Sequence, residues 1–444
     1  DRGDVRHGGG DGPMMLMLYR ILTTVGGPAI KYYLKRRIVE GKEDPSRFAE
    51  RKGKSAQRRP KGPLIWLHAA SVGESLSMLP LIETLLNADS QLHVLMTTGT
   101  VTSAALMADR LPERSFHQYV PVDRAAYIRK FLSHWRPDLA LWAESEFWPN
   151  LLMETQRRNV PMILVNGRIS PKSFSGWRWF PGVIGQLLRG FTLCLGQTEG
   201  DADRLKQLGA RNHKCLGNLK FAVPPLPADT EELIRLEQQI SSRPRWLAAS
   251  THPGEEEVAG QVHAKIGPRH PGLLTIIVPR HAGRGSDIAV RLRSEGFFTA
   301  QRSRQETITP ETEIYIADTM GELGLFFRLS DIAFIGKSLV PLGGQNPLEA
   351  LQLDCAVIHG PHMANFQRIT EEMAKTGSAL AVTGGGALAA AVETLLKDDK
   401  QRQSLIENGR EYMESHSHVV DRVSREILTV LKTDATGKSP HAAA

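Results

Sequence analysis

Two glutamates follow apolar runs at points where the chain must turn, and a lysine lies just before a proline-rich linker. Glu74 lies in LHAASVGES directly after LIWLH, Glu144 ends LALWAE, and Lys220 lies in GNLKF. Gly73, next to Glu74, allows close approach of a substrate, whose hydroxyl proton the carboxylate can accept. The spacing from Ser71 to Glu74 is also that of a capping box, so a role as helix cap stays open. Taken singly, Glu144 and Lys220 also fit a polar strand end and a surface lysine.

Three turns in the second half of the chain have residue types that are typical of anion sites. VPRHAGRG carries Arg280, whose guanidinium matches the geometry of a phosphate. DTMGELG contains Gly321, which lets backbone N–H groups face a ligand. In GGQNPLEA, Asn346 is a predicted N-cap, Pro347 the first helical residue and Glu349 its capping-box partner. Together they predict a nucleotide-phosphate ligand, and the absence of GxxxxGK[ST] excludes a P-loop NTPase.

The elements that must position these residues alternate between strands and helices. Short apolar runs separated by amphipathic segments predict parallel sheets covered by helices on both faces. The predicted strands are 64–68, 93–98, 139–144, 162–167, 193–197, 246–250, 273–279, 314–318, 332–336, 355–360 and 379–382. A proline-rich linker, 223–230, separates two α/β domains of the doubly wound type, in which ligands bind beyond the carboxyl ends of the strands. A single long helical pattern from Asp399 to Lys432 closes the chain.

Composition excludes several classes of protein. The chain of 444 residues is 41% hydrophobic and 23% charged, which is typical of a globular protein with two domains. Its three cysteines are isolated, which suits a reducing compartment and argues against structural zinc. The formal charge of +7 allows nucleic acid as a partner, but no nucleic-acid-binding motif is present. The DAD sequence at 201–203 falls in a helical pattern, so we expect solvated surface there and no metal site.

The N-terminal region combines an apolar run with basic residues. Residues 1–13 precede the first methionines, and we expect them to be an extraneous leader. The segment 14–37 is too short and too interrupted to cross a bilayer cleanly, but a shallow anchor needs less. We expect a membrane-anchoring segment; a terminal helix packed on its own domain is the alternative. The predicted domains are 38–222 and 231–432, the second including the closing helix, followed by a tail, 433–444.

Seven sequences in order carry a family likeness: HAASVGE, ESEFWPN, GNLKF, VPRH, DTMGEL, FIGKSLVPLGGQNPLEA and GPHMANF. Together they resemble the 3-deoxy-D-manno-octulosonic acid (Kdo) transferases of lipopolysaccharide assembly, from about Met14 into the final helix. The resemblance implies a GT-B fold with two Rossmann-like domains facing a cleft. It also implies metal-independent, inverting transfer of Kdo from CMP-Kdo to a lipid A precursor, without a cofactor. The family is tethered to the cytoplasmic face of the inner membrane by an N-terminal segment.

At the positions that match the family's motifs, the resemblance implies that Glu74 is the general base and that Glu144 and Lys220 stabilise the transition state. The residues that it implies for CMP binding are Pro279, Arg280, Met320, Gly321, Glu322, Asn346, Pro347, Leu348 and Glu349. Two positions depart from the family pattern, which has histidine at Gln345 and an acid at Ala222. The alternatives are a GT-B transferase with another nucleotide sugar, a non-hydrolysing epimerase and a catalytically silent lipid-A-binding protein.

Overall fold

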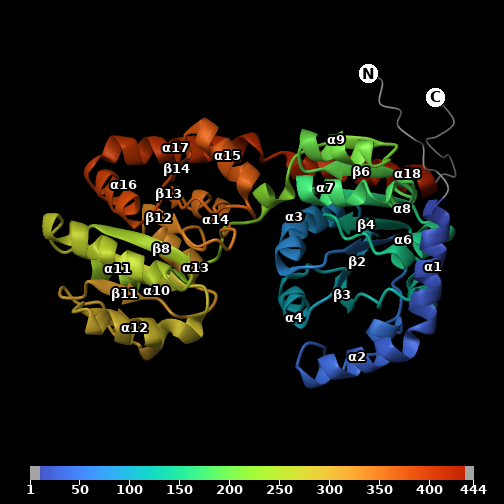
Figure 1. The fold of residues 1–444 in the computed structure, drawn as a ribbon, viewed down its shortest axis with the longest axis horizontal. Helices are drawn as coiled ribbons and strands as arrows, with labels where there is room; N and C mark the ends of the chain where they lie inside the picture. The colour runs from blue at the N-terminus through green and yellow to red at the C-terminus, as the bar shows by residue number, and fades with distance from the viewer. Residues whose placement is uncertain (1–10, 436–444) are drawn as a thin grey trace. The chain divides into compact units, whose positions relative to one another are not determined.

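The computed structural model describes residues 11–435 (Figure 1). Most of the expected leader, and residues 436–444 of the expected tail, therefore lie outside the described residues. Residues 11–13 form the beginning of helix α1 (Asp11–Val25). The described chain divides into two compact units: a first unit of residues 11–223 and 416–435, and a second unit of residues 224–415.

The first unit is built on a seven-stranded parallel sheet in the order β3-β2-β1-β4-β5-β6-β7. Its strands are β1 (Leu64–His68), β2 (His93–Thr98), β3 (Ser115–Tyr119), β4 (Leu139–Ala143), β5 (Met162–Gly167), β6 (Leu193–Gly196) and β7 (His213–Cys215). Its α-helices are α1, α2 (Gly27–Val39), α3 (Val72–Ala88), α4 (Val101–Arg110), α5 (Ala125–Trp135), α6 (Pro149–Arg157), α7 (Pro171–Trp177), α8 (Pro181–Arg189), α9 (Glu199–Gln207) and α18 (Val419–Ala435). Short 3₁₀ turns are η1 (Glu50–Lys52) and η2 (Leu219–Ala222).

This sheet separates two hydrophobic cores, because successive strand residues point to opposite faces. In β1, Ile65 and Leu67 belong to one core, together with residues of α3 and α18. Leu64 and Trp66 belong to the other core, together with residues of α1, α5, α6 and α8. A strand buried on both faces must be apolar throughout, which explains the uninterrupted run at 64–67.

The second unit repeats the architecture, with the strand order β10-β11-β9-β8-β12-β13-β14 and all pairs parallel. Its strands are β8 (Arg245–Thr251), β9 (Leu274–Pro279), β10 (Thr299–Gln301), β11 (Ile314–Ile316), β12 (Ile332–Ile335), β13 (Ala356–His359) and β14 (Ala379–Ala381). Its α-helices are α10 (Thr230–Ile240), α11 (Glu255–Ile266), α12 (Gly285–Ser294), α13 (Leu323–Arg328), α14 (Leu348–Leu351), α15 (Gln367–Thr376), α16 (Gly385–Lys397) and α17 (Asp399–Ser415). Short 3₁₀ turns are η3 (Gly267–Arg269), η4 (Ala282–Arg284) and η5 (Arg302–Arg304).

The end of the chain differs from the sequence-based prediction in two ways. The pattern that we expected to form one helix is divided into α17 and α18, which residues 416–418 separate. We also assigned the closing helix to the domain 231–432, and that assignment is wrong for α18. Val419, Val423 and Ile427 pack into a core of the first unit, so the apolar face of α18 is buried there.

Candidate active site

Glu74 lies in the first turn of α3, where its carboxylate completes the helix N-terminus. Ser71 is the N-cap, and its Oγ accepts a hydrogen bond from the Glu74 backbone N–H at 3.3 Å. Glu74 Oε2 accepts one from the Ala70 backbone N–H, and Oε1 accepts one from the Ser71 hydroxyl, both at 2.8 Å. The predicted capping role is therefore confirmed, with Ala70 rather than Ser71 as the backbone donor. These bonds use two of the roughly four acceptor sites of a carboxylate, so Glu74 can still accept a proton.

Glu144 follows β4 in a left-handed conformation, with a φ of 57° and its N–H bonded to the Val165 carbonyl at 3.0 Å. Such a φ is uncommon for a residue other than glycine. The Lys220 ammonium lies 2.8 Å from Glu144 Oε1, and the contact has the geometry of an ion pair rather than a directed hydrogen bond. Both side chains are largely shielded from solvent, with exposed fractions of 21% and 16%. The structure thus joins two residues that the sequence presented separately.

The turn that carries Lys220 is fixed by two asparagines. Asn218 Oδ1 accepts the Lys220 N–H at 3.0 Å and caps η2. Asn166, at the end of β5, accepts the Leu219 N–H through Oδ1 at 3.0 Å. Its buried Nδ2 has no partner among the described residues. An unsatisfied amide at the carboxyl end of a strand is a signal of a ligand contact that the sequence did not reveal.

Glu74 and Glu144 lie close enough for the charge of Glu144 to affect the pKa of Glu74. The pKa of Glu74 is raised, first because its carboxyl is buried and second because the Glu144 charge disfavours a second negative charge. The bonds from Ala70 and Ser71 oppose that shift. A raised pKa makes a carboxylate a better proton acceptor near neutral pH. The two glutamates follow β1 and β4, which are neighbours across the point where the strand order reverses, and ligands of open α/β sheets bind there.

In the second unit, the first residues that the resemblance assigns to CMP binding lie at the end of β9. Pro279 is the buried last residue of β9, and Arg280 follows it with an exposed side chain. The Arg280 N–H donates to the Thr251 carbonyl at 3.0 Å, which joins the ends of β8 and β9. The backbone of Arg280 is therefore fixed at the carboxyl edge of the sheet, and its exposed side chain is accessible to an anion there.

The loop Met320–Gly321–Glu322 precedes α13. Met320 is 73% exposed, and Gly321 has a φ of 84°, which favours glycine. The guanidinium of Arg302 donates to both Glu322 oxygens, at 2.6 and 2.5 Å, and the Thr319 hydroxyl donates to Glu322 as well. Arg302 is the main cause of the lowered pKa of Glu322. The arginine thus fixes this loop through its carboxylate.

The loop before α14 differs from the predicted helix start. The helix is one turn, and its N-cap is Pro347 rather than Asn346. Asn346 still serves the helix start, because its Oδ1 accepts the Leu348 N–H and its Nδ2 donates to Glu349 Oε1, both at 3.2 Å. Burial raises the pKa of Glu349, and the hydrogen bond from Asn346 and the charge of Arg280 oppose the shift. One helical turn has only a small dipole, so binding of an anion here depends on side chains and on the N–H groups of the loop.

Comparison with known proteins decides the family. The family model of the 3-deoxy-D-manno-octulosonic-acid transferases (kdotransferases) matches residues 46–223. The chain is 36% identical over 431 residues to the probable mitochondrial 3-deoxy-D-manno-octulosonic acid transferase of Arabidopsis thaliana, covering 95% of this chain and 94% of that protein. It is 32% identical to the 3-deoxy-D-manno-octulosonic acid transferase of Haemophilus influenzae, covering 92% and 97%. The chain belongs to the Kdo transferase family.

Solved structures agree on the fold. A putative UDP-N-acetylglucosamine 2-epimerase from Listeria monocytogenes aligns with a TM-score of 0.59 at 12% identity, covering 85% of this chain and 98% of that chain. A glycosyltransferase from Rickettsia africae aligns with a TM-score of 0.56 at 13% identity, covering 84% and 98%. The likeness to these chains concerns the fold alone. Together with the two parallel-sheet α/β units, it gives this Kdo transferase family member a fold of the GT-B glycosyltransferase type.

Two basic residues at the carboxyl edge of the second sheet were missed from the sequence: His252 after β8 and Lys337 after β12. Lys337 lies within the motif FIGKSLVPLGGQNPLEA, but the resemblance assigned it no role. His252 lies in THPGE, directly after a predicted strand and outside the seven motifs. Residues 11–435 hold no cluster of three or more His, Cys, Asp or Glu side chains with the geometry of a metal site. Within the same residues, no helix has the length and apolar character that a bilayer crossing requires.

Proposed function

We propose that this Kdo transferase family member moves Kdo from CMP-Kdo to a lipid A precursor, lipid IVA, with inversion at the sugar carbon. The observation that carries the proposal is the grouping of Glu74, Glu144 and Lys220 at the strand-order reversal of the first unit. Family membership supports the Kdo donor. A carboxylate base beside a charged pair suits the deprotonation of a sugar hydroxyl and the stabilisation of the charge that develops during its attack.

In the acceptor half of the reaction, Glu74 takes the proton of the attacking hydroxyl. The oxygen then forms a bond to the anomeric carbon of Kdo on the face opposite the leaving phosphate. Sugar transfer passes through a state with positive charge on the ring, which the Glu144 carboxylate stabilises. Lys220 balances Glu144 at 2.8 Å and so limits how far Glu144 raises the pKa of the base. Because Lys220 already has Glu144 as its partner, the family's acid at the position of Ala222 is not needed for that purpose.

In the donor half, the bond between the anomeric carbon and a phosphate oxygen breaks, and its electron pair stays on CMP. Arg280 offsets the charge that the phosphate gains. Pro279, Met320, Gly321, Asn346, Pro347 and Leu348 complete the proposed CMP site with Glu322 and Glu349. Glu349 accepts hydrogen bonds from ribose hydroxyls, and Glu322 keeps its loop in place through Arg302. The chemistry proposed uses no metal and no cofactor.

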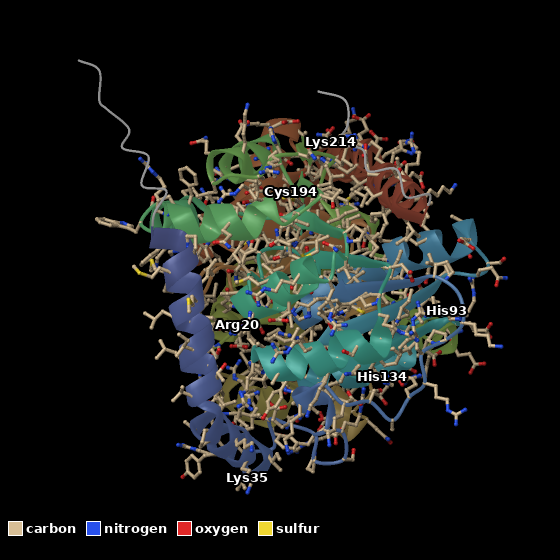
Figure 2. The ribbon with its side chains drawn as sticks, turned by 90° about the vertical axis from the view of Figure 1, so that its right-hand side faces the viewer. Arg20, Lys35, His93, His134, Cys194 and Lys214 are labelled. Carbon is tan, nitrogen blue, oxygen red and sulfur yellow. The ribbon has the colours of Figure 1, made fainter. Side chains whose placement is uncertain are left out.

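The N-terminal helices support a membrane surface as the place of action. On α1, Leu16 is buried against the unit and Arg20 pairs with Glu154 at 2.9 Å. Figure 2 shows α1 along an edge of the unit, with a row of side chains directed away from it. The apolar side chains exposed on α1 and α2 are Met14, Met15, Met17, Leu18, Ile21, Leu22, Val25, Tyr32, Tyr33 and Val39.

Basic residues follow this apolar face on α2, where Lys31, Lys35 and Arg36 are exposed. Figure 2 labels Lys35. An apolar face beside lysines and arginines is typical of a helix that lies in the interface of a membrane with anionic lipids. We propose that α1 and α2 anchor the protein on the cytoplasmic face of the inner membrane, lying on the bilayer. A lipid-embedded acceptor would then diffuse along the membrane surface on which the first unit lies, and the first unit would bind it there.

Transfer of labelled Kdo from CMP-Kdo, generated in situ, to tetraacylated lipid A precursor tests the proposal. The assay uses the full chain with lipid acceptor in mixed micelles, and product is separated by thin-layer chromatography. The proposed function predicts a product with Kdo attached to the precursor, formed in the presence of a metal chelator. A folded protein that binds CMP without forming product would contradict the proposal and favour a silent lipid-A-binding protein. Transfer from another nucleotide sugar alone would favour a different donor.

A further inference from the structure

Four basic side chains stand at the ends of three neighbouring strands in the second unit. His252 follows β8, Arg280 and His281 follow β9, and Lys337 follows β12. The sheet places β8 between β9 and β12, so these three turns adjoin one another, and the strand order reverses between β8 and β12. Only Arg280 has a role in the proposed donor site so far. His252 and Lys337 flank the reversal, where a doubly wound sheet binds its ligand.

A buried carboxylate holds the turns of His252 and Lys337 together. Glu255, 2% exposed, accepts the His252 N–H at 2.9 Å and the Lys337 N–H at 2.6 Å through Oε2. Its Oε1 accepts the N–H groups of Ser338 and Leu339, both at 3.0 Å. The carboxylate therefore accepts four backbone hydrogen bonds, two at each oxygen. The two turns are fixed relative to each other before any ligand binds.

The loop that carries the proposed CMP residues is tied to the same place. The Gly344 N–H donates to the Lys337 carbonyl at 2.9 Å, and Gln345 Nε2 lies 3.3 Å from His252 Nε2. Gln345 occupies the position where the family pattern has histidine, and here its neutral amide donates to the imidazole. His252 and Lys337 are thus in the immediate surroundings of Asn346 rather than on a separate surface.

The acid side chains near this edge, Glu349 and Glu256, match its positive charge only in part. No carboxylate among residues 11–435 forms an ion pair with Lys337 or Arg280 within 4.0 Å. Burial, followed by the charges of Lys337, His281 and Arg280, lowers the pKa of His252, and Glu256 opposes the shift. Glu256 itself is bonded to Thr251 and Arg284. Basic groups that repel each other at a ligand-binding edge are stabilised by an anion placed among them.

We propose that His252 and Lys337 contact the phosphate of the donor and stabilise it as it leaves. The inference rests on the proposed function for the identity of the nucleotide, and it adds two contact residues to it. When the bond from the anomeric carbon to the phosphate oxygen breaks, the phosphate goes from one negative charge to two. The ammonium of Lys337 and the imidazole of His252 offset the added charge, while the acceptor's proton goes to Glu74. Binding of the phosphate favours the protonated form of His252, which takes its proton from solvent, and the Gln345 amide then turns its oxygen toward the imidazole to accept the new N–H.

Comparing CMP with cytidine isolates the phosphate contact. Isothermal titration calorimetry on the full chain would measure both ligands for the parent, Lys337→Met and His252→Leu. A hydrogen bond to a charged group contributes about 1.5–3 kcal/mol, so each variant should lose about tenfold to a hundredfold in CMP affinity. Cytidine affinity should stay within about twofold of the parent. Lys337→Arg should recover most of the CMP affinity, and Lys375→Ala, an exposed lysine on α15, should change neither ligand.

The other outcomes separate failure of this inference from failure of the proposed donor. Equal losses for CMP and cytidine would show that the residues only shape the fold, and unchanged CMP affinity would show that they do not contact the phosphate. If the parent binds another nucleotide but not CMP, the proposed donor fails, and that nucleotide is then compared with its own nucleoside in the same variants. A selective loss for the nucleotide would keep the phosphate contact. A parent that binds no nucleotide would contradict both proposals.

Discussion

Replacing Glu255 by glutamine tests how much of the donor-side geometry depends on one buried carboxylate. Each oxygen of Glu255 accepts two backbone N–H groups, those of His252 and Lys337 on one side and those of Ser338 and Leu339 on the other. Glutamine offers one oxygen and one NH₂ group. Whichever way the amide turns, two backbone donors lose their acceptor and face another donor.

The expected cost follows from these two orphaned donors. A buried donor left without a partner costs about 1–3 kcal/mol, so two of them cost about 2–6 kcal/mol. The loss of the negative charge near the start of α11 adds less than about 1 kcal/mol. We therefore expect Glu255→Gln to lower the free energy of unfolding of the second unit by about 4 kcal/mol. The affinity for CMP should fall as well, because the turns of His252 and Lys337 separate.

Hydrogen exchange followed by mass spectrometry measures this cost within the second unit. Peptides that contain β8 and β12 report its opening free energy in increasing denaturant. The matched control is Glu257→Gln, in the same first turn of α11. Its half-buried carboxylate pairs with Arg291 and accepts no backbone hydrogen bond from residues 11–435. The control should cost about 1 kcal/mol or less. A loss below about 1 kcal/mol for Glu255→Gln, or equal losses in both variants, would refute the role of Glu255 in holding the turns of His252 and Lys337 together.

Three other outcomes follow from burial and exposure. The pKa of His68, a 1% exposed residue, is lowered to about 4 chiefly by burial, so only the unfolded chain protonates it just below pH 6.5. The contribution of His68 to stability should therefore be nearly constant above about pH 7.5 and fall by about 2 kcal/mol by about pH 5, and His68→Gln should remove that part of the slope in urea-unfolding curves. The double variant Leu18→Glu/Leu22→Glu should no longer co-sediment with anionic vesicles, whereas Val290→Glu, at a similarly exposed position on α12, should still do so. Equal binding by the parent, the double variant and the Val290 variant would contradict the anchor. A thiol reagent should label Cys215 in the native protein and the two buried cysteines only after denaturation, and rapid labelling of all three would contradict their burial.

The sequence predicted the sheets well because their strands are buried on both faces. The apolar runs LIWL in β1, VLM in β2 and MILV in β5 have polar residues only at their ends, and the predicted bounds agree with the structure. The edge strand β3 (Ser115–Tyr119) and the short strands β7 and β10 were missed, since polar residues occupy them. The closing helix was assigned to the wrong unit because an amphipathic pattern shows which face is buried but not what covers it.

For the candidate site, sequence motifs supplied the residues and the structure supplied their relations. The cap made by Glu74 was predictable, since it depends on spacing within one helical turn. The pairing of Lys220 with Glu144 was not, because it joins separate strand ends and requires the left-handed turn at Glu144. The same reason hid His252 and Lys337, which become neighbours only through the strand order and the Glu255 bonds.

The central claim is that Glu74 is the base and not only a helix cap, and Glu74→Gln tests it most directly. Glutamine can still accept the Ala70 N–H, so the cap is kept while the proton acceptor is lost. The matched variant, Ser71→Ala, removes the cap hydroxyl, costs about 1 kcal/mol of stability, and leaves the carboxylate.

Both variants are compared with the parent for Kdo transfer to the lipid A precursor at equal folded concentration. We predict that Glu74→Gln unfolds like the parent and loses at least about a hundredfold in turnover, while Ser71→Ala retains most of the activity. Transfer by Glu74→Gln within about threefold of the parent would contradict the account and leave Glu74 as a cap alone.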